Sequence, residues 1–128
     1  MSEKSVAEKI LIKAGYTVLL LNEPPEYRQA LGSLPLSVTV ITRPAGKSDL
    51  VQLFVSSRQD LEAKLGGLKA ALKPNGLLWV TYPKGTSKLK ADINRDVIRE
   101  YAQTVGLEAV SLVSVDDTWS ALRLKVIG

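Results

Sequence analysis

The stretch from Ala71 to Pro83, ALKPNGLLWVTYP, constrains the fold more than any other part of this chain. It predicts the end of a helix, a Lys-Pro-x-Gly turn over residues 73–76, and an apolar strand from Leu77 to Tyr82. A helix that leads through a short turn into an apolar strand is one unit of an alternating α/β chain. We therefore expect the same alternation on both sides of it.

The flanking sequence continues this alternation. Residues 5–13 predict a helix with a capping box at Ser5 and Glu8, stopped by Gly15. The run from Tyr16 to Leu21 predicts a strand covered on both faces, which we expect to be central, and a short helix should follow over residues 25–31. Further strands are predicted at 38–41, 50–55, 107–115 and 119–127, and further helices after the N-caps Ser57 and Asp92.

The order of these elements predicts one α/β domain over residues 1–128. The expected architecture is a three-layer, Rossmann-like open sheet, mostly parallel, with a C-terminal antiparallel hairpin turned at residues 116–118. Gly66 and Gly67 lie inside the helix predicted after Ser57, which carries Leu61, Leu65, Leu68 and Leu72 on one face. Because glycine costs a helix about 1 kcal/mol relative to alanine, we expect a close backbone approach there.

The composition excludes several classes of function. The 128 residues include no cysteine and no histidine, which removes disulfides, thiolate nucleophiles and the usual zinc ligands. Proton transfer would depend on Asp, Glu, Lys or Tyr with a shifted pKa. We expect no catalytic residues and no metal site.

The same composition bears on location and partners. No apolar run is long enough to span a membrane and the first residues do not resemble a signal peptide, so we expect a cytoplasmic protein without membrane contact. The net charge of +4 is scattered along the chain, without the interleaved aromatic residues of a nucleic-acid surface, which argues against nucleic-acid binding.

The order of elements from Gly15 to Ile127 resembles that of class I S-adenosylmethionine-dependent methyltransferases. Three departures stand out. The glycine-rich loop after the first strand is replaced by Asn22-Glu23-Pro24-Pro25-Glu26, and Thr42-Arg43 stand where the family carries the acidic residue for the cofactor ribose. The interval 43–49 is also too short for the helix and strand that full-sized members insert, so the resemblance implies an abridged sheet.

Four segments are similar to a family of small bacterial proteins of unknown function: VLLLNEP, DLVQLFV, LLWVTYPKGTSK and VDDTWSALR. This resemblance supports the fold and implies no chemistry. The methyltransferase resemblance implies S-adenosylmethionine as a possible cofactor, whereas the missing loop favours a domain without one.

Open α/β sheets bind ligands outside the carboxyl ends of their strands. The candidate ligand-binding residues at those ends are Asn22, Glu23, Ser56, Lys84, Ser87 and Lys88. The lysines and backbone N–H groups of the loop at 84–90 suit a phosphate or carboxylate, and a solvated surface loop is the alternative. Glu23 suits a ribose hydroxyl, and a rigid Asn-Glu-Pro-Pro turn is the alternative.

Three other features favour structural roles. Asp116 and Asp117 fit a hairpin turn better than a paired-carboxylate site, and Ser57 fits a helix cap because no histidine is present to activate it. Trp79 and Tyr82 fit core packing, although one face of their strand could reach a ligand or partner.

These observations lead to one main hypothesis and two alternatives. The main hypothesis is a non-catalytic or degenerate methyltransferase-like domain that binds a small anionic ligand or a protein partner. The alternatives are a small S-adenosylmethionine-dependent methyltransferase with an atypical loop, holding the cofactor through Asn22, Glu23 and Ser56, and a weak nucleic-acid-binding protein. Loss of a strand beside the second strand would also leave an edge through which a homodimer could form.

Overall fold

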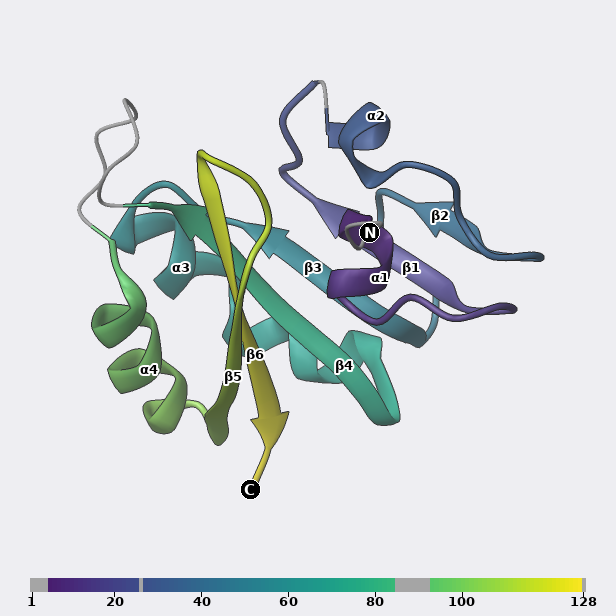
Figure 1. Ribbon diagram of the computed structural model, residues 1–128. Helices are drawn as coiled ribbons and strands as arrows, with labels where there is room; N and C mark the ends of the chain where they lie inside the picture. Colours follow the sequence, from purple (N-terminus) through teal and green to yellow (C-terminus); the bar gives the residue numbers. More distant parts are fainter. Residues whose placement is uncertain (1–4, 26, 85–92, 128) are drawn as a thin grey trace.

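A six-stranded sheet forms the centre of the computed structural model, which describes residues 5–25, 27–84 and 93–127 (Figure 1). No helix within these residues is long and apolar enough to cross a membrane. The elements, in chain order, are α1 (Val6–Lys9), β1 (Thr17–Leu21), α2 (Tyr27–Leu31), β2 (Thr39–Ile41), β3 (Ser48–Phe54), α3 (Arg58–Lys64), the 3₁₀ helix η1 (Gly66–Ala71), β4 (Leu72–Pro83), α4 (Arg95–Thr104), β5 (Leu107–Ser114) and β6 (Trp119–Val126).

The strand order in the sheet is β2-β1-β3-β4-β6-β5. The first four strands are parallel, and β6 runs antiparallel to both β4 and β5. This confirms the predicted mostly parallel sheet with a C-terminal antiparallel hairpin. The prediction that the strand after Gly15 is central was wrong: β1 has only the three-residue β2 outside it. Because the interval between β2 and β3 is too short for a further strand, the centre of the sheet falls on β3 and β4.

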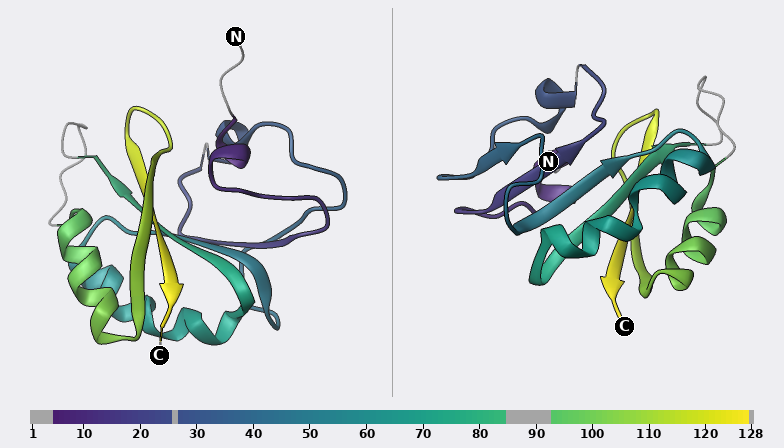
Figure 2. Two further views of the ribbon diagram at one scale, coloured as in Figure 1. Left: turned by 60° about the horizontal axis from the view of Figure 1, so that its bottom comes forward. Right: turned by 180° about the vertical axis from the view of Figure 1, so that it is seen from behind.

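Helices cover both faces of the sheet, as expected for three layers. On one face, Leu61 of α3 and Ile98 of α4 join a core cluster with Val51 and Leu78 of the sheet. On the other, Ile10, just after α1, joins a cluster with Val18 and other sheet residues. The view from behind in Figure 2 shows α3 and η1 lying across the first of these faces.

Several helix boundaries differ from the sequence prediction. The capping box at Ser5 and Glu8 is present, but α1 ends at Lys9 because Leu11 adopts a left-handed conformation with φ 69°. The N-cap of α4 is Asn94, whose side chain accepts a hydrogen bond from the Val97 N–H, and the predicted cap Asp92 lies outside the described residues. Sequence alone could not choose between two good caps so close together.

The helix after Ser57 does not continue through the two glycines. Ser57 caps α3 as predicted, accepting from the Asp60 N–H at 3.1 Å, but the α-helix stops at Lys64 and a 3₁₀ helix follows. The expected close approach was wrong: a Cβ at Gly66 would lie 3.7 Å from Val105, and one at Gly67 would meet nothing within 4 Å. The glycines instead lie where the α-helix changes to a 3₁₀ helix. Glycine has a low intrinsic α-helix propensity, so little stability is lost by ending the α-helix there.

The Lys-Pro-x-Gly turn is an excursion within β4. Leu72 pairs with Ser48 and Leu77 pairs with Leu50, so residues 73–76 loop out of the β3–β4 ladder. Asn75 is left-handed with φ 64°, and a Cβ at Gly76 would lie 2.8 Å from the Leu72 side chain and 2.9 Å from the Lys73 carbonyl oxygen. Glycine is therefore required sterically at this position.

Candidate functional site

A hollow of about 290 Å³ lies at the carboxyl ends of β1 and β3. Asn22 follows β1 directly, and Val55 and Ser56 follow β3. The full lining consists of Asn22, Phe54, Val55, Ser56, Asp60, Lys64 and Trp119. We call this hollow the crevice. Its location is the one where open α/β sheets bind ligands, because neighbouring strand ends and their loops diverge there.

The loop from β1 to α2 bounds the crevice without any glycine. Asn22 takes up the left-handed backbone that the turn needs, with φ 61°. The Glu23 carboxylate oxygen Oε2 lies 3.4 Å from Nε of Arg28. The Tyr27 N–H donates to the carbonyl oxygen of Pro24 at 3.0 Å. Pro24 and Pro25 have no backbone N–H, so this loop offers fewer backbone donors than a glycine-rich turn supplies.

Aromatic side chains fill the sheet face behind the crevice. Tyr27 of α2 is only 2% exposed and packs edge-on against Phe54, with ring centroids 4.6 Å apart. Phe54 packs in the same way against Trp119, at 5.3 Å. We call Tyr27, Phe54 and Trp119 the aromatic chain. It joins α2, β3 and β6 and occupies space beneath the first β-to-α connection.

A buried hydrogen-bond network holds the aromatic chain in place. The Tyr27 hydroxyl donates to Gln52 Oε1 at 2.7 Å, and Gln52 Nε2 donates to Thr81 Oγ1 at 2.8 Å. Burial raises the pKa of Tyr27 far above its ordinary value, outweighing the opposite effect of the Gln52 hydrogen bond. Tyr27 is therefore a neutral, packed side chain and does not supply the shifted acid or base that catalysis without histidine would need.

The structure brings together two of the six predicted ligand-binding residues. Asn22 and Ser56 line the same crevice. Glu23 is instead paired with Arg28. The Lys84 ammonium donates to Ser114 Oγ at 2.6 Å, so Lys84 braces the hairpin. Ser87 and Lys88 lie outside the described residues. Ligand binding by these residues stays a prediction.

Asp60, Lys64 and Trp119 also line the crevice, and sequence reasoning missed them. Neither Asp60 nor Trp119 was among the predicted ligand-binding residues. The spacing of Asp60 and Lys64, four residues apart on α3, was a usable signal because it places both on one helix face. Nothing in the sequence indicated that Trp119, at the start of β6, would reach the end of β3.

The hairpin beside the crevice is turned as predicted. Asp116 Oδ1 accepts hydrogen bonds from the N–H groups of Thr118 and Trp119, each at 2.8 Å. Asp116 therefore shapes the turn. Among the described residues, no group of three or more carboxylates is arranged to hold a metal ion.

Residues 40–127 match the model of DUF3052, a family described as a protein of unknown function. The chain belongs to this family. The match covers the sheet from β2 onward, including both ends of the β4 strand and the hairpin. Comparison with curated proteins gives no match.

Solved structures with the same fold include S-adenosylmethionine-dependent methyltransferases. DhpI in complex with SAH is 14% identical, with a TM-score of 0.64, over 95% of this chain and 83% of DhpI. A SAM-dependent methyltransferase from Aquifex aeolicus is 15% identical, with a TM-score of 0.63, over 95% of this chain and 88% of the enzyme. The B. subtilis M1A22 tRNA methyltransferase TrmK is 14% identical, with a TM-score of 0.56, over 96% and 64% of the two chains.

These similarities establish a class I methyltransferase-like fold for the chain. Because the sequence identity is so low, these similarities support a conclusion about the fold and about nothing else. What the chain does with its crevice must be argued from its own residues.

Proposed function

We propose that this DUF3052 member is a non-catalytic, methyltransferase-like domain whose crevice binds a small anionic ligand. The observation that carries the proposal is the aromatic chain, held by Gln52, behind a crevice of about 290 Å³. Sites for drug-sized ligands have roughly 300–1,000 Å³. Methyl transfer requires a cofactor and an acceptor side by side, and this crevice has room for little more than one small molecule.

The lining of the crevice suits such a ligand. The Lys64 ammonium supplies a positive charge, the Asn22 amide and Ser56 hydroxyl supply neutral donors, and Trp119 supplies an apolar wall. Asp60 adds a carboxylate, which favours a ligand that carries a cationic group beside its anionic one. The proposed location of the domain is the cytoplasm.

Calorimetric titration tests this proposal, with orthophosphate, succinate, L-methionine, S-adenosylmethionine and SAH as probes. We expect at least one of the first three to bind, and Lys64→Ala to weaken that binding. The matched control is Arg58→Ala, because Arg58 lies on the same helix but does not line the crevice. If none of the five probes binds in the titration, the result would contradict ligand binding. It would favour the form of the main hypothesis in which the domain binds a protein partner.

The second candidate is a small S-adenosylmethionine-dependent methyltransferase. It is favoured by the fold, because solved structures with SAH or SAM bound align with about 95% of this chain. In this proposal Asn22 and Ser56 contact the cofactor, while Glu23 would first have to leave Arg28. Binding of S-adenosylmethionine that Asn22→Ala weakens, together with transfer of a labelled methyl group to any acceptor, would support it over the first proposal.

A further inference from the structure

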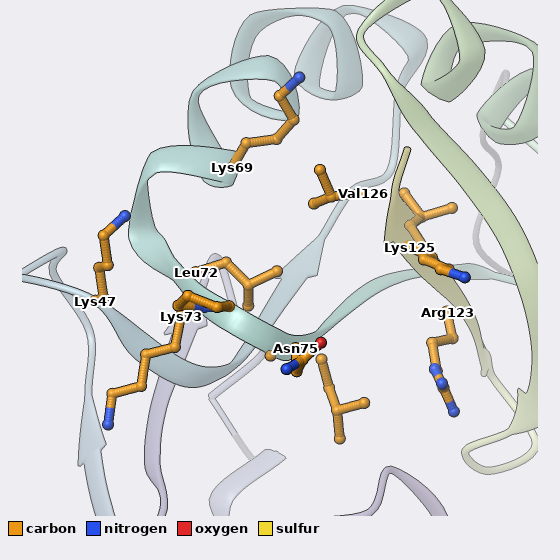
Figure 3. Close-up of a pocket in the computed structure, with 12 residues that line it drawn as sticks. Lys47, Lys69, Leu72, Lys73, Asn75, Arg123, Lys125 and Val126 are labelled. Carbon is orange, nitrogen blue, oxygen red and sulfur yellow. The ribbon is translucent and has the colours of Figure 1, made fainter. Parts of the chain in front are cut away.

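A second, larger hollow of about 500 Å³ lies at the opposite end of the sheet from the crevice. It surrounds the excursion of β4 at residues 73–76, beside the C-terminal half of β6. Five basic residues line it: Lys47, Lys69, Lys73, Arg123 and Lys125. We call it the basic hollow. Figure 3 shows these side chains distributed around Leu72 and Asn75.

The charges in the basic hollow are poorly neutralised. Lys73 lies 3.3 Å from the Asp49 carboxylate, which offsets one charge. The ammonium groups of Lys47 and Lys69 donate to the backbone carbonyl oxygens of Ala70 and Val105, at 3.3 and 2.8 Å. Carbonyl groups carry no net charge, so these two lysines keep theirs.

Arg123 and Lys125 are two residues apart on β6, so their side chains point to the same side of the sheet. Within the part of the chain that the structure describes, neither forms an ion pair, although Glu108 lies opposite Lys125 in the β5–β6 register. Lys47, Lys69, Arg123 and Lys125 therefore bring four positive charges, without an ion-pair partner among the described residues, to the lining of one hollow. Clustered like charges repel each other, which costs stability unless an anion binds.

The shape and apolar lining narrow the class of anion. The cations come from four separate segments around one hollow, and no recognised nucleic-acid-binding motif accompanies them. The volume is within the range of small-molecule sites. Leu77 and Val126 add apolar surface beside the charges. An elongated ligand with several negative charges at one end fits this lining.

We propose that the basic hollow binds a polyphosphate group, carried by a nucleoside triphosphate or by free inorganic polyphosphate. A triphosphate carries about as many negative charges as the hollow carries uncompensated positive ones. Arg123 would contribute bidentate hydrogen bonds to phosphate oxygens and the lysines point charges. This site is independent of the crevice and of the function proposed for it.

Titration calorimetry with ATP and with tripolyphosphate, in magnesium-free buffer at low ionic strength, tests the proposal. We expect both to bind, with an affinity that falls as salt is added. Tighter binding of ATP would identify the nucleotide as the natural class, and equal binding the free polyphosphate. The double variant Arg123→Gln/Lys125→Gln should weaken binding about tenfold or more, because it removes two charged hydrogen-bond donors to the phosphate oxygens.

Two controls separate this site from a general effect of charge and from the crevice. Arg95→Gln/Arg99→Gln removes the same net charge from the exposed face of α4 and should leave ATP affinity unchanged. Lys64→Ala alters the crevice and should also leave it unchanged. Absence of binding, equal weakening by either control, or a single-stranded RNA that binds far more tightly than ATP would overturn the proposal.

Discussion

Ser48, Gln52 and Thr81 are polar side chains buried in the central strands, and they differ in how they are satisfied. Gln52 and Thr81 belong to the network that begins at Tyr27, whereas the Ser48 hydroxyl has no hydrogen-bond partner in the described structure. A buried polar group without a hydrogen-bond partner lowers the stability of the fold. A buried polar group that is paired lowers it only when a mutation removes the partner. The two cases predict opposite effects of mutation.

Gln52→Leu should destabilise the domain by about 2 kcal/mol, because it leaves the Tyr27 hydroxyl buried without an acceptor. Urea unfolding measures the loss. Adding Tyr27→Phe to this variant removes the orphaned hydroxyl and should restore part of the stability. If the double variant is no more stable than Gln52→Leu, the hydrogen bond does not hold the aromatic chain.

Ser48→Ala should leave the free energy of unfolding unchanged or raise it by up to about 1 kcal/mol, since it removes an unpaired buried hydroxyl. Ser57→Ala is the matched control. Ser57 caps α3, so its loss should cost about 1 kcal/mol. Thermal and urea unfolding of both variants measure the difference, and equal destabilisation would show that Ser48 has a partner in solution.

Among the elements, one carboxylate connects three neighbouring strands, β1, β3 and β4, near their amino ends. Asp49 Oδ2 accepts from the Thr17 N–H at 2.8 Å and from the Lys73 ammonium at 3.3 Å, so it links β1, β3 and the excursion of β4. The Thr17 hydrogen bond, aided by Lys73, holds the pKa of Asp49 below its ordinary value. This connection also positions one wall of the basic hollow.

Asp49→Asn should cost about 1 kcal/mol near neutral pH, because a neutral amide accepts these hydrogen bonds more weakly. A lowered pKa in the folded state means that the carboxylate stabilises the fold above the ordinary Asp pKa, and that this effect is lost as pH falls through the lowered value. The difference between wild type and variant should therefore disappear in acid. Urea unfolding at a series of pH values measures it, and a difference that persists in acid would contradict the assignment.

Gly76→Ala should destabilise the domain by about 1–3 kcal/mol, because its Cβ would collide with Leu72 and the Lys73 carbonyl oxygen. Gly67→Ala is the control, since that site has open space and no positive φ. We expect Gly67→Ala to be neutral or slightly stabilising. Thermal denaturation compares the two, and equal effects would mean that the excursion of β4 is not sterically fixed.

At the scale of the whole molecule, the sheet has two different edges. The β2 edge is three residues long, whereas the β5 edge carries Val110 and Leu112 with 42% and 44% exposure. A free sheet edge offers unpaired backbone groups to another copy.

We expect self-association through the β2 edge, detected as a concentration-dependent sedimentation coefficient. Thr39→Lys should abolish it, because a lysine on an edge strand opposes edge-to-edge pairing. Val110→Lys, on the β5 edge, is the control. Loss of association in Val110→Lys alone would assign the interface to β5, and a monomer at every concentration would exclude the homodimer.

Much of this architecture followed from local signals. The hairpin turn, the caps Ser5 and Ser57, and the abridged interval between β2 and β3 depend on residues within a few positions of one another. Helix length after Ser57 and the position of β1 in the sheet were predicted wrongly. Both depend on what packs beside a segment, and propensity does not report packing.

Turn chemistry and hydrophobic periodicity act over short distances, so the residues alone were enough to predict the strands, the antiparallel ending and the absence of the glycine loop. The meeting of Tyr27, Phe54 and Trp119 behind the crevice became visible only in the folded chain. The same holds for the hollow that Lys47, Lys69 and Arg123 line together. Those residues are far apart in the chain. Their proximity is set by strand order and register, which arise from packing of the whole sheet.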